Sequence, residues 1–319
     1  MSANALIIRL AGGHLFGFEV VLYLWLGGLG GGLSAVAGVA GLSIPRRFLQ
    51  DGLVSLYSNL MRMALVIAAA LLALGSMLLL ADSDNFAALA YLFLSPPFGY
   101  LSVGAWLIVV DMGLCLILVL FWRAGSAGQN FVVSRILHAV CMIVGLAVAL
   151  YTGLFLASMK AVPLWNTPWL PALFVLSSIS CGIVLFLVLH QASDKGATFS
   201  SYMKLLAKVD VAIVALELLC ALALVVGLVI GSIGSPTSTA GAASAYSLIA
   251  GEYAWIWWGG FVGLGIVLTA LLDIMVIRVE KSLPGRIWST LGVSFCVAAG
   301  ALSLRYCIVA AGMHPALGF

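Results

Sequence analysis

Charged residues are scarce in this chain, where they make up 8% of 319 residues against 64% apolar residues. A soluble domain cannot cover its surface with so few charges. The formal net charge of +3 is small and the basic residues are scattered. This excludes a nucleic-acid-binding surface, which needs a basic patch or stripe. The composition predicts an integral membrane protein.

Cysteines are few and are not arranged as ligand pairs. All six fall within apolar runs, and no two form a CxxC motif. This argues against a disulfide framework and against an iron–sulfur cluster held by this chain alone. We interpret them as small buried apolar residues. They are Cys115, Cys141, Cys181, Cys220, Cys296 and Cys307.

Long apolar runs dominate the chain. A membrane span needs about 20 apolar residues, and none of the runs alternates as a barrel strand would, so all should be helices. The first run is too long for a signal peptide and lacks a basic segment before it, so we expect it to be retained. We predict one all-α membrane domain over residues 1–319. Its eight expected spans are 15–41, 58–80, 99–122, 134–158, 169–190, 207–230, 252–277 and 287–311.

The basic residues divide unevenly between alternate loops. Of the 14 Lys and Arg residues, all but Arg9, Lys160 and the intrahelical Arg305 lie in or beside the first, third, fifth and seventh loops. Basic loops stay on the cytoplasmic side of a membrane. We therefore predict that both termini lie outside. The longer, chemically varied connections are then also outside, where a partner subunit could dock.

A glycine-rich stretch, Gly27-Gly28-Leu29-Gly30-Gly31-Gly32, lies inside the first apolar run. Its spacing resembles a nucleotide-binding loop, but no strand precedes it, so that interpretation is excluded. Glycines four residues apart instead allow close approach of another helix or of a flat ligand. Helix packing is the favoured interpretation.

Polar residues near the start of the first span suggest a site for a quinone headgroup. Glu19 and Tyr23 are four residues apart and should share a helical face that continues into the glycines. His14 lies just before this helix at a similar depth and could exchange a proton with a quinone oxygen. The alternatives are a carboxylate that hydrogen-bonds a neighbouring helix and a solvated interfacial histidine.

Other ionisable residues lie within apolar spans, where each costs at least about 2.5–3.5 kcal/mol on insertion scales. Asp210 and Glu217 are two turns apart on one helical face, either as a proton relay or as structural groups. Glu252 and Arg305 should lie at the same depth and form a structural ion pair. Asp111 is isolated at mid-depth and is a further relay candidate.

Two histidines invite comparison with haem-binding membrane anchors, which use histidines at matched depth on different helices. His138 begins the fourth span and His190 ends the fifth. Both lie at the edge of the membrane, so we expect no haem.

Several segments are similar to the NrfD/polysulfide-reductase family of membrane subunits. The stretch Pro163-Leu164-Trp165-Asn166-Thr167-Pro168 resembles the family's loop before its fifth helix and is the most specific match. The other matching segments follow in the family's order along the chain. They are Glu19–Gly32, Tyr151–Gly153, Leu170–Phe174, Asp210 with Glu217, Leu304–Tyr306 and Ala310–Gly312.

The resemblance implies an anchor of two four-helix bundles in the prokaryotic cytoplasmic (inner) membrane. It would bind menaquinone or ubiquinone without haem and exchange electrons with a four-cluster ferredoxin-like subunit, itself joined to a molybdopterin enzyme. The family's histidine by the first helix and tyrosine of the fourth carry over to His14 and Tyr151. With Glu19 they would grip the headgroup, while Trp165 and Asn166 wall the pocket or contact the partner.

A different class of function is an ion-coupled secondary transporter that uses Glu19, Asp111, Glu217 and Arg305. Transporters usually show inverted repeats and helices broken by Gly or Pro near mid-depth. The sequence shows neither clearly. We therefore favour the anchor over the transporter, and over a haem-b cytochrome-type anchor.

Overall fold

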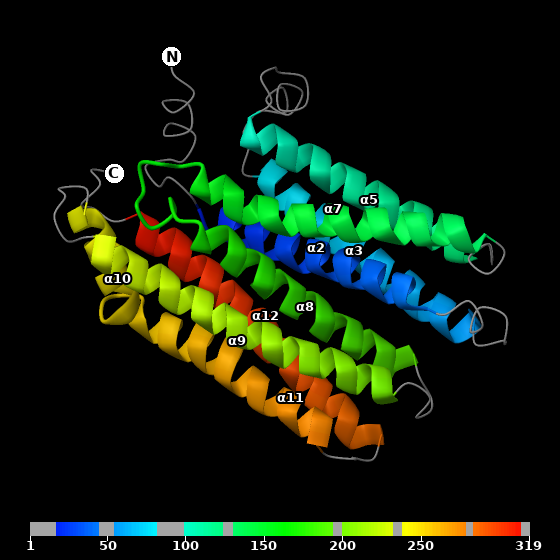
Figure 1. Ribbon diagram of the computed structural model, residues 1–319. Helices are drawn as coiled ribbons and strands as arrows, with labels where there is room; N and C mark the ends of the chain where they lie inside the picture. Colours follow the sequence, from blue (N-terminus) through cyan, green and yellow to red (C-terminus); the bar gives the residue numbers. More distant parts are fainter. Residues whose placement is uncertain are drawn as a thin grey trace.

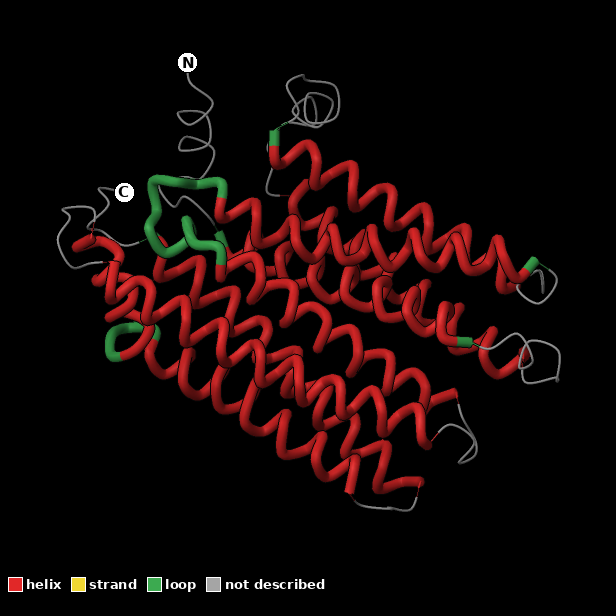
Figure 2. The backbone as a smooth tube through the Cα atoms, viewed as in Figure 1, coloured by secondary structure: helices red, strands yellow, loops and turns green. Residues whose placement is uncertain are grey.

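The computed structural model describes residues 17–44, 54–81, 99–123, 130–193, 200–231, 238–278 and 283–313. Within these ranges the regular structure is helical and contains no strand (Figure 2). Eight helices are long and apolar enough to cross a membrane, which confirms the predicted all-α fold. The elements are α2 (Phe18–Ser43), α3 (Val54–Ala81), α5 (Tyr100–Arg123), α7 (Phe131–Ala157), α8 (Trp169–Ser193), α9 (Ser200–Gly231), α10 (Ser238–Ile249), η3 (Ile256–Leu268), α11 (Thr269–Arg278) and α12 (Leu283–Gly312).

The spans fall into two groups of four according to their contacts. In the first bundle, α2 and α5 each pack against both α3 and α7. In the second bundle, α8 and α11 each pack against both α9 and α12, and η3 packs against α12. The bundles meet where α2 and α7 contact α8, and where α2 contacts α12 (Figure 1). Helix α2 is therefore the central helix of the protein.

Glycines of α2 allow three neighbouring helices to approach its backbone. A Cβ atom on Gly30 would overlap Leu72 of α3, and one on Gly31 would lie 2.9 Å from the Gly145 carbonyl of α7. A Cβ on Gly32 would overlap the Ser178 carbonyl of α8. The glycine run is thus explained by helix packing, as the sequence favoured, because each glycine meets a different neighbour.

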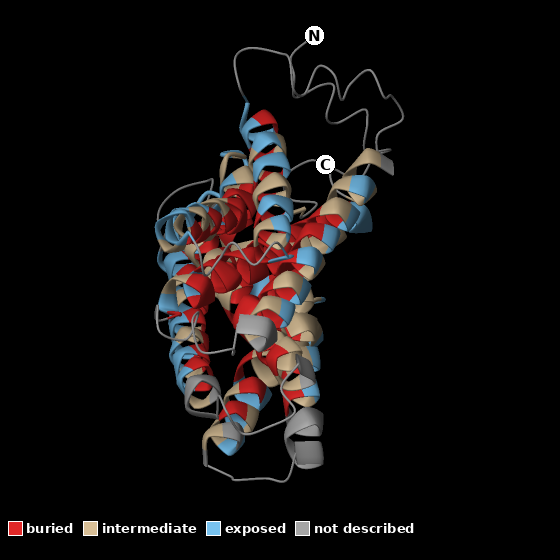
Figure 3. Ribbon diagram, turned by 90° about the vertical axis from the view of Figure 1, so that its right-hand side faces the viewer, coloured by how far each residue is buried: buried red, intermediate tan, exposed pale blue. Residues whose placement is uncertain are grey.

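The two ends of the bundle differ in their described side chains. We call the end where α2 begins and α12 finishes the terminal end. Exposed aromatic side chains gather there on Tyr100, Trp169, Trp255 and Trp258, as expected at a membrane interface. Buried positions face the middle of the molecule and exposed apolar ones its flanks (Figure 3). This pattern suits helices surrounded by lipid.

Two features depart from the sequence-based expectation. The connection between the sixth and seventh predicted spans, which is rich in Ser, Gly and Ala, contains the additional helix α10. The seventh span, expected as one helix over 252–277, begins as the π-helix η3 and continues as α11. Its backbone closely approaches α12, since a Cβ atom on Gly265 would lie 2.8 Å from the Gly300 Cα. Glycines therefore bring η3 and α12 together.

Candidate functional site

Two buried tyrosines face each other near the terminal end of the first bundle. Tyr23 lies in the second turn of α2 and Tyr151 in the last two turns of α7, and they are 2% and 3% exposed. The Tyr23 hydroxyl donates to the Tyr151 hydroxyl at 3.5 Å. The Tyr151 ring lies directly over Gly104 of α5, where any Cβ atom would overlap the ring. The phenol pair is therefore formed by α2 and α7 and is packed against α5.

The phenol pair is surrounded by apolar side chains, and one more buried hydroxyl group lies near the terminal end of α5. Ile108 and Val148 belong to the buried cluster that contains both tyrosines. The Ser102 hydroxyl, two residues before Gly104, is buried without a hydrogen-bond partner in the described part of the chain. Sequence reasoning missed Ser102 and Gly104, because small residues near the start of an apolar helix carry no distinctive pattern.

Glu19 and Tyr23 were predicted to share a helical face, but at the start of α2 their side chains lie in different environments. Tyr23 is buried, whereas Glu19 is exposed. The Glu19 carboxylate folds back over Gly17, where an added Cβ atom would overlap it. This location suits a carboxylate, because the first turn of a helix presents free N–H groups and a positive dipole end. His14 lies outside the described residues.

Trp165 and Asn166, from the most specific motif, have different environments. The Trp165 indole is buried, donates to the Ile308 carbonyl at 2.8 Å and packs against Gly312. It thereby joins the connection between α7 and α8 to α12. Asn166 is exposed at the terminal end. Of the two, only Asn166 presents a free surface for a partner in the described structure.

Arg305 is buried at the junction of the two bundles, with 1% of its surface exposed. Its Nε donates to the Leu24 carbonyl of α2 at 3.1 Å, and Nη2 donates to the Ser178 hydroxyl at 3.0 Å. Its Nη1 donates to the Ala301 carbonyl at 3.0 Å and to the Ser177 hydroxyl at 3.4 Å. Arg305 thus links α12 to α2 and α8, next to Tyr23.

The carboxylate that faces Arg305 is Glu217 of α9, not Glu252. Glu217 is buried, interacts electrostatically with Arg305 and lies within hydrogen-bonding reach of Ser177. Glu252 is exposed in the connection between α10 and η3, so the structure does not bring the expected pair together. Burial, with a smaller contribution from Glu252, raises the pKa of the neighbouring Tyr253.

Asp210, two turns from Glu217 along α9, lies next to a second carboxyl group in the second bundle. It interacts with Asp273 of α11, near Ser180 of α8, and both aspartates are buried. Both oxygens of Asp210 and the Oδ2 atom of Asp273 are buried without a hydrogen-bond partner in the described part of the chain. The Asp210 carboxyl group also interacts electrostatically with Glu217. The predicted Asp210–Glu217 face therefore lies inside the bundle, and Asp273 of α11 lies beside it.

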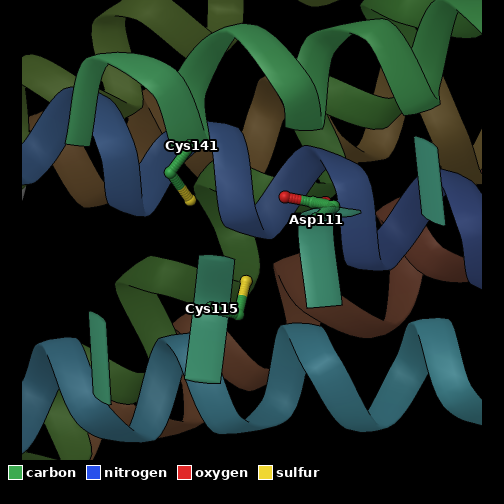
Figure 4. A group of neighbouring side chains, drawn as sticks. All are labelled: Asp111, Cys115 and Cys141. Atoms are coloured by element: carbon green, nitrogen blue, oxygen red, sulfur yellow. The ribbon is translucent and has the colours of Figure 1, made fainter. Parts of the chain in front are cut away.

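Asp111 is isolated in the sequence but not in the structure. Its Oδ2 accepts a hydrogen bond from the Ser34 hydroxyl at 2.8 Å. The thiols of Cys115 and Cys141 point toward the same space (Figure 4). The interpretation of all six cysteines as separate apolar residues is therefore incomplete for these two.

His138 uses both ring nitrogens within the first bundle. Its Nε2 accepts from the Trp122 indole at 3.2 Å, and its Nδ1 lies 2.7 Å from the Ser134 carbonyl. His190 is buried near the end of α8. These contacts give His138 a structural role, and the expected absence of haem stays a prediction.

Comparisons with known proteins agree with the architecture. The chain is 29% identical over 180 residues to Protein NrfD of Escherichia coli (strain K12), covering 56% of this chain and 54% of that protein. It is 31% identical over 193 residues to the C subunit of polysulfide reductase of Wolinella succinogenes, covering 59% of this chain and 57% of that protein. The chain thus spans just over half the length of each relative. The family model "Polysulphide reductase, NrfD" matches residues 8–315, nearly the whole chain. This multi-pass membrane protein therefore belongs to the NrfD polysulphide reductase family.

Proposed function

We propose that this chain binds quinone or quinol and anchors a respiratory molybdopterin oxidoreductase in the prokaryotic inner membrane. The observation that carries the proposal is the Tyr23–Tyr151 phenol pair, buried among three helices at the terminal end. Phenol hydroxyls can donate hydrogen bonds to the carbonyl oxygens of a quinone. Menaquinone or ubiquinone would supply two-electron, two-proton chemistry when bound.

The residues present suit a flat, mostly apolar headgroup with two oxygens. The site offers two phenol hydroxyls and the unpartnered Ser102 hydroxyl among buried apolar side chains. Pockets for small molecules have this combination of apolar walls and a few polar groups. Glu19 stands at the outer end of α2, where a carboxylate can exchange protons with the aqueous phase. We include His14 in the site from the family resemblance.

The partners that we propose are a four-cluster ferredoxin-like iron–sulfur subunit and a molybdopterin catalytic subunit. A relative named as the C subunit of a polysulfide reductase supports membership of a multi-subunit complex. The partner would dock at the terminal end, close to the phenol pair and to the exposed Asn166. Electrons would then pass directly between quinone and the iron–sulfur subunit, with no haem or cluster in this chain. The charge bias of the loops supports a location of this end and both termini outside.

Tyr151→Phe should lower quinol-linked turnover of the intact complex about tenfold. The substitution keeps the ring over Gly104 and removes only the hydroxyl, which accepts from Tyr23 and can donate to the quinone; one hydrogen bond is worth about 0.5–1.5 kcal/mol. Turnover and the binding of a quinone analogue would be measured in membranes, with Tyr246→Phe as the matched control because Tyr246 is exposed. Equal turnover in Tyr151→Phe, Tyr23→Phe and Tyr246→Phe would refute the site.

We further propose that the buried acids of the second bundle relay protons. Asp210 and Asp273 lead to Glu217, and Ser177 bridges Glu217 to Arg305, which bonds the Leu24 carbonyl beside Tyr23. Asp111 lies in the other bundle, so this relay runs without it. These contacts support a polar route from the opposite end as far as Arg305 and the Leu24 carbonyl of α2.

Glu217→Gln should slow proton movement roughly tenfold or more while the complex still assembles. An amide keeps the hydrogen bond to Ser177 but cannot bind and release a proton, and acid–base groups commonly contribute about 10²–10⁴-fold. Proton movement per electron pair would be recorded in proteoliposomes with a pH-sensitive dye. Glu252→Gln, at an exposed carboxylate, is the control. Unchanged proton movement in Glu217→Gln and Asp210→Asn would rule out the relay.

A further inference from the structure

Three potential metal ligands from two helices converge in the middle of the first bundle. Asp111 and Cys115 are four residues apart on α5 and share a face; Cys141 reaches them from α7. One carboxylate oxygen and the two Sγ atoms all lie within 4.8 Å of one another. Figure 4 shows the thiols of Cys115 and Cys141 pointing toward one another from facing helices, with Asp111 beside them. All three side chains are 0% exposed.

The carboxylate is held in place on one side and unsatisfied on the other. Oδ2 of Asp111 accepts from the Ser34 hydroxyl of α2 at 2.8 Å. Oδ1 is buried and has no hydrogen-bond partner in the described structure. A buried carboxylate oxygen without a partner is costly in an apolar interior. This oxygen is an independent indication that a ligand belongs at the cluster.

The backbone around the cluster leaves little room for rearrangement. The Cys141 thiol donates to the Ser34 carbonyl at 3.6 Å. One turn further along α7, a Cβ atom on Gly145 would overlap the Ser34 hydroxyl. Both cysteines belong to the tightly packed apolar core of the first bundle. Helices α2, α5 and α7 therefore fix the ligands before any ion binds, which favours binding because few side chains must be ordered.

The chemistry of these ligands selects one class of ion. Thiolates prefer soft or borderline ions, among them Zn²⁺, which also accepts carboxylate oxygen as a ligand. Two thiolates on one Zn²⁺ lie roughly 3.8 Å apart, so the sulfurs need to move by no more than about 1 Å. A divalent ion bound by two thiolates and one carboxylate leaves the unit with a charge of −1, instead of −3 for the three deprotonated ligands alone. This reduction matters here because net charge in the bilayer is costly.

We propose that Asp111, Cys115 and Cys141 form a binding site for a single Zn²⁺-like ion that joins α5 to α7. Ser34 orients the carboxylate, as hydrogen-bond partners of metal ligands commonly do. The ion would act as a structural clip inside the first bundle. This proposal does not depend on the quinone proposal, because the cluster lies on α5 between mid-depth and the opposite end, beyond the Gly104–Tyr151 contact.

The test is metal content of the purified complex after equilibration with Zn²⁺ and dialysis against a weak chelator. We expect about one Zn²⁺ per copy of this chain, measured by mass spectrometry of the elements. Asp111→Asn and Cys141→Ser should bind Zn²⁺ at least roughly 100-fold more weakly, and Ser34→Ala about 10–100-fold more weakly. Cys296→Ser is the matched control, because Cys296 is a buried cysteine of α12 in the second bundle. It should retain the ion.

Two further measurements separate loss of the ion from loss of the fold. Zn²⁺ should raise the melting temperature of the wild type and of Cys296→Ser but not of Asp111→Asn. Co²⁺ in place of Zn²⁺ should give the absorption of a thiolate-bound ion in the wild type and in Cys296→Ser but not in Cys141→Ser. Equal metal content in all variants would mean an adventitious ion only and would overturn the proposal. A Cys115–Cys141 disulfide in the metal-free, air-handled complex that Zn²⁺ cannot prevent would also overturn it.

Discussion

Gly32→Val is expected to leave almost no folded protein in the membrane. A Cβ atom at this position would overlap the Ser178 carbonyl of α8, and backbone atoms there cannot move aside as a side chain could. The contact is reciprocal, since a Cβ on Gly182 would overlap the Gly32 carbonyl. Overpacking typically costs 1–3 kcal/mol, and we expect about 3 kcal/mol or more here. Folded protein would be measured by fluorescence-detected size exclusion and by thermal unfolding in detergent.

Gly113→Val provides the control on a helix of the same bundle. No atom outside its own helix lies within 4 Å of a Cβ atom placed on Gly113, so the larger side chain meets open space. Its effect should be within about 1 kcal/mol, because a glycine in a helix interior is itself unfavourable. If Gly32→Ala, the smallest change, unfolded at the same temperature as Gly113→Ala, the tight α2–α8 interface would be wrong.

The membrane helices were predictable because their signal is local. An uninterrupted apolar run of sufficient length identifies a span whatever it packs against. Helix α10 was missed because Ser, Gly and Ala in succession also suit a loop. The π-helical start of the seventh span was missed for a different reason. Its apolar and glycine composition is compatible with either helix type, and the contact between Gly265 and Gly300 is known only from the fold.

The candidate site was only partly predictable because depth and facing direction are separate properties. Sequence position gives depth, and Tyr23 near the start of α2 and Tyr151 near the end of α7 do lie within hydrogen-bonding distance. The direction in which a side chain faces depends on how each helix is rotated within the bundle. Glu252 and Arg305 were expected to pair because they share a depth, yet Arg305 faces Glu217. Cys115 and Cys141 meet for the same reason, although nothing in their spacing indicated it.

Arg305→Met is the second substitution from which we expect a large effect, a loss of about 3–5 kcal/mol of folding free energy. It removes the donors to Leu24, Ser177 and Ser178 at the junction of the bundles. It also leaves the buried Glu217 carboxyl group without the guanidinium that faces it, and removing one partner of a buried pair has this cost. Arg305→Lys should recover little, because an ammonium group cannot span three partners as a guanidinium does. Thermal and denaturant unfolding in detergent would measure both variants.

A second substitution decides which carboxylate is the partner of Arg305. If the partner is Glu217, then Arg305→Met combined with Glu217→Gln should recover part of the lost stability, since no carboxyl group is then left buried without its partner. Combined with Glu252→Gln, the same arginine variant should recover nothing, because Glu252 is exposed. Recovery with Glu252→Gln instead would reinstate the pair expected from sequence depth and would remove Arg305 from the proposed relay. The two double variants differ only in which carboxylate is replaced, so the comparison decides whether Arg305 of α12 faces Glu217 of α9.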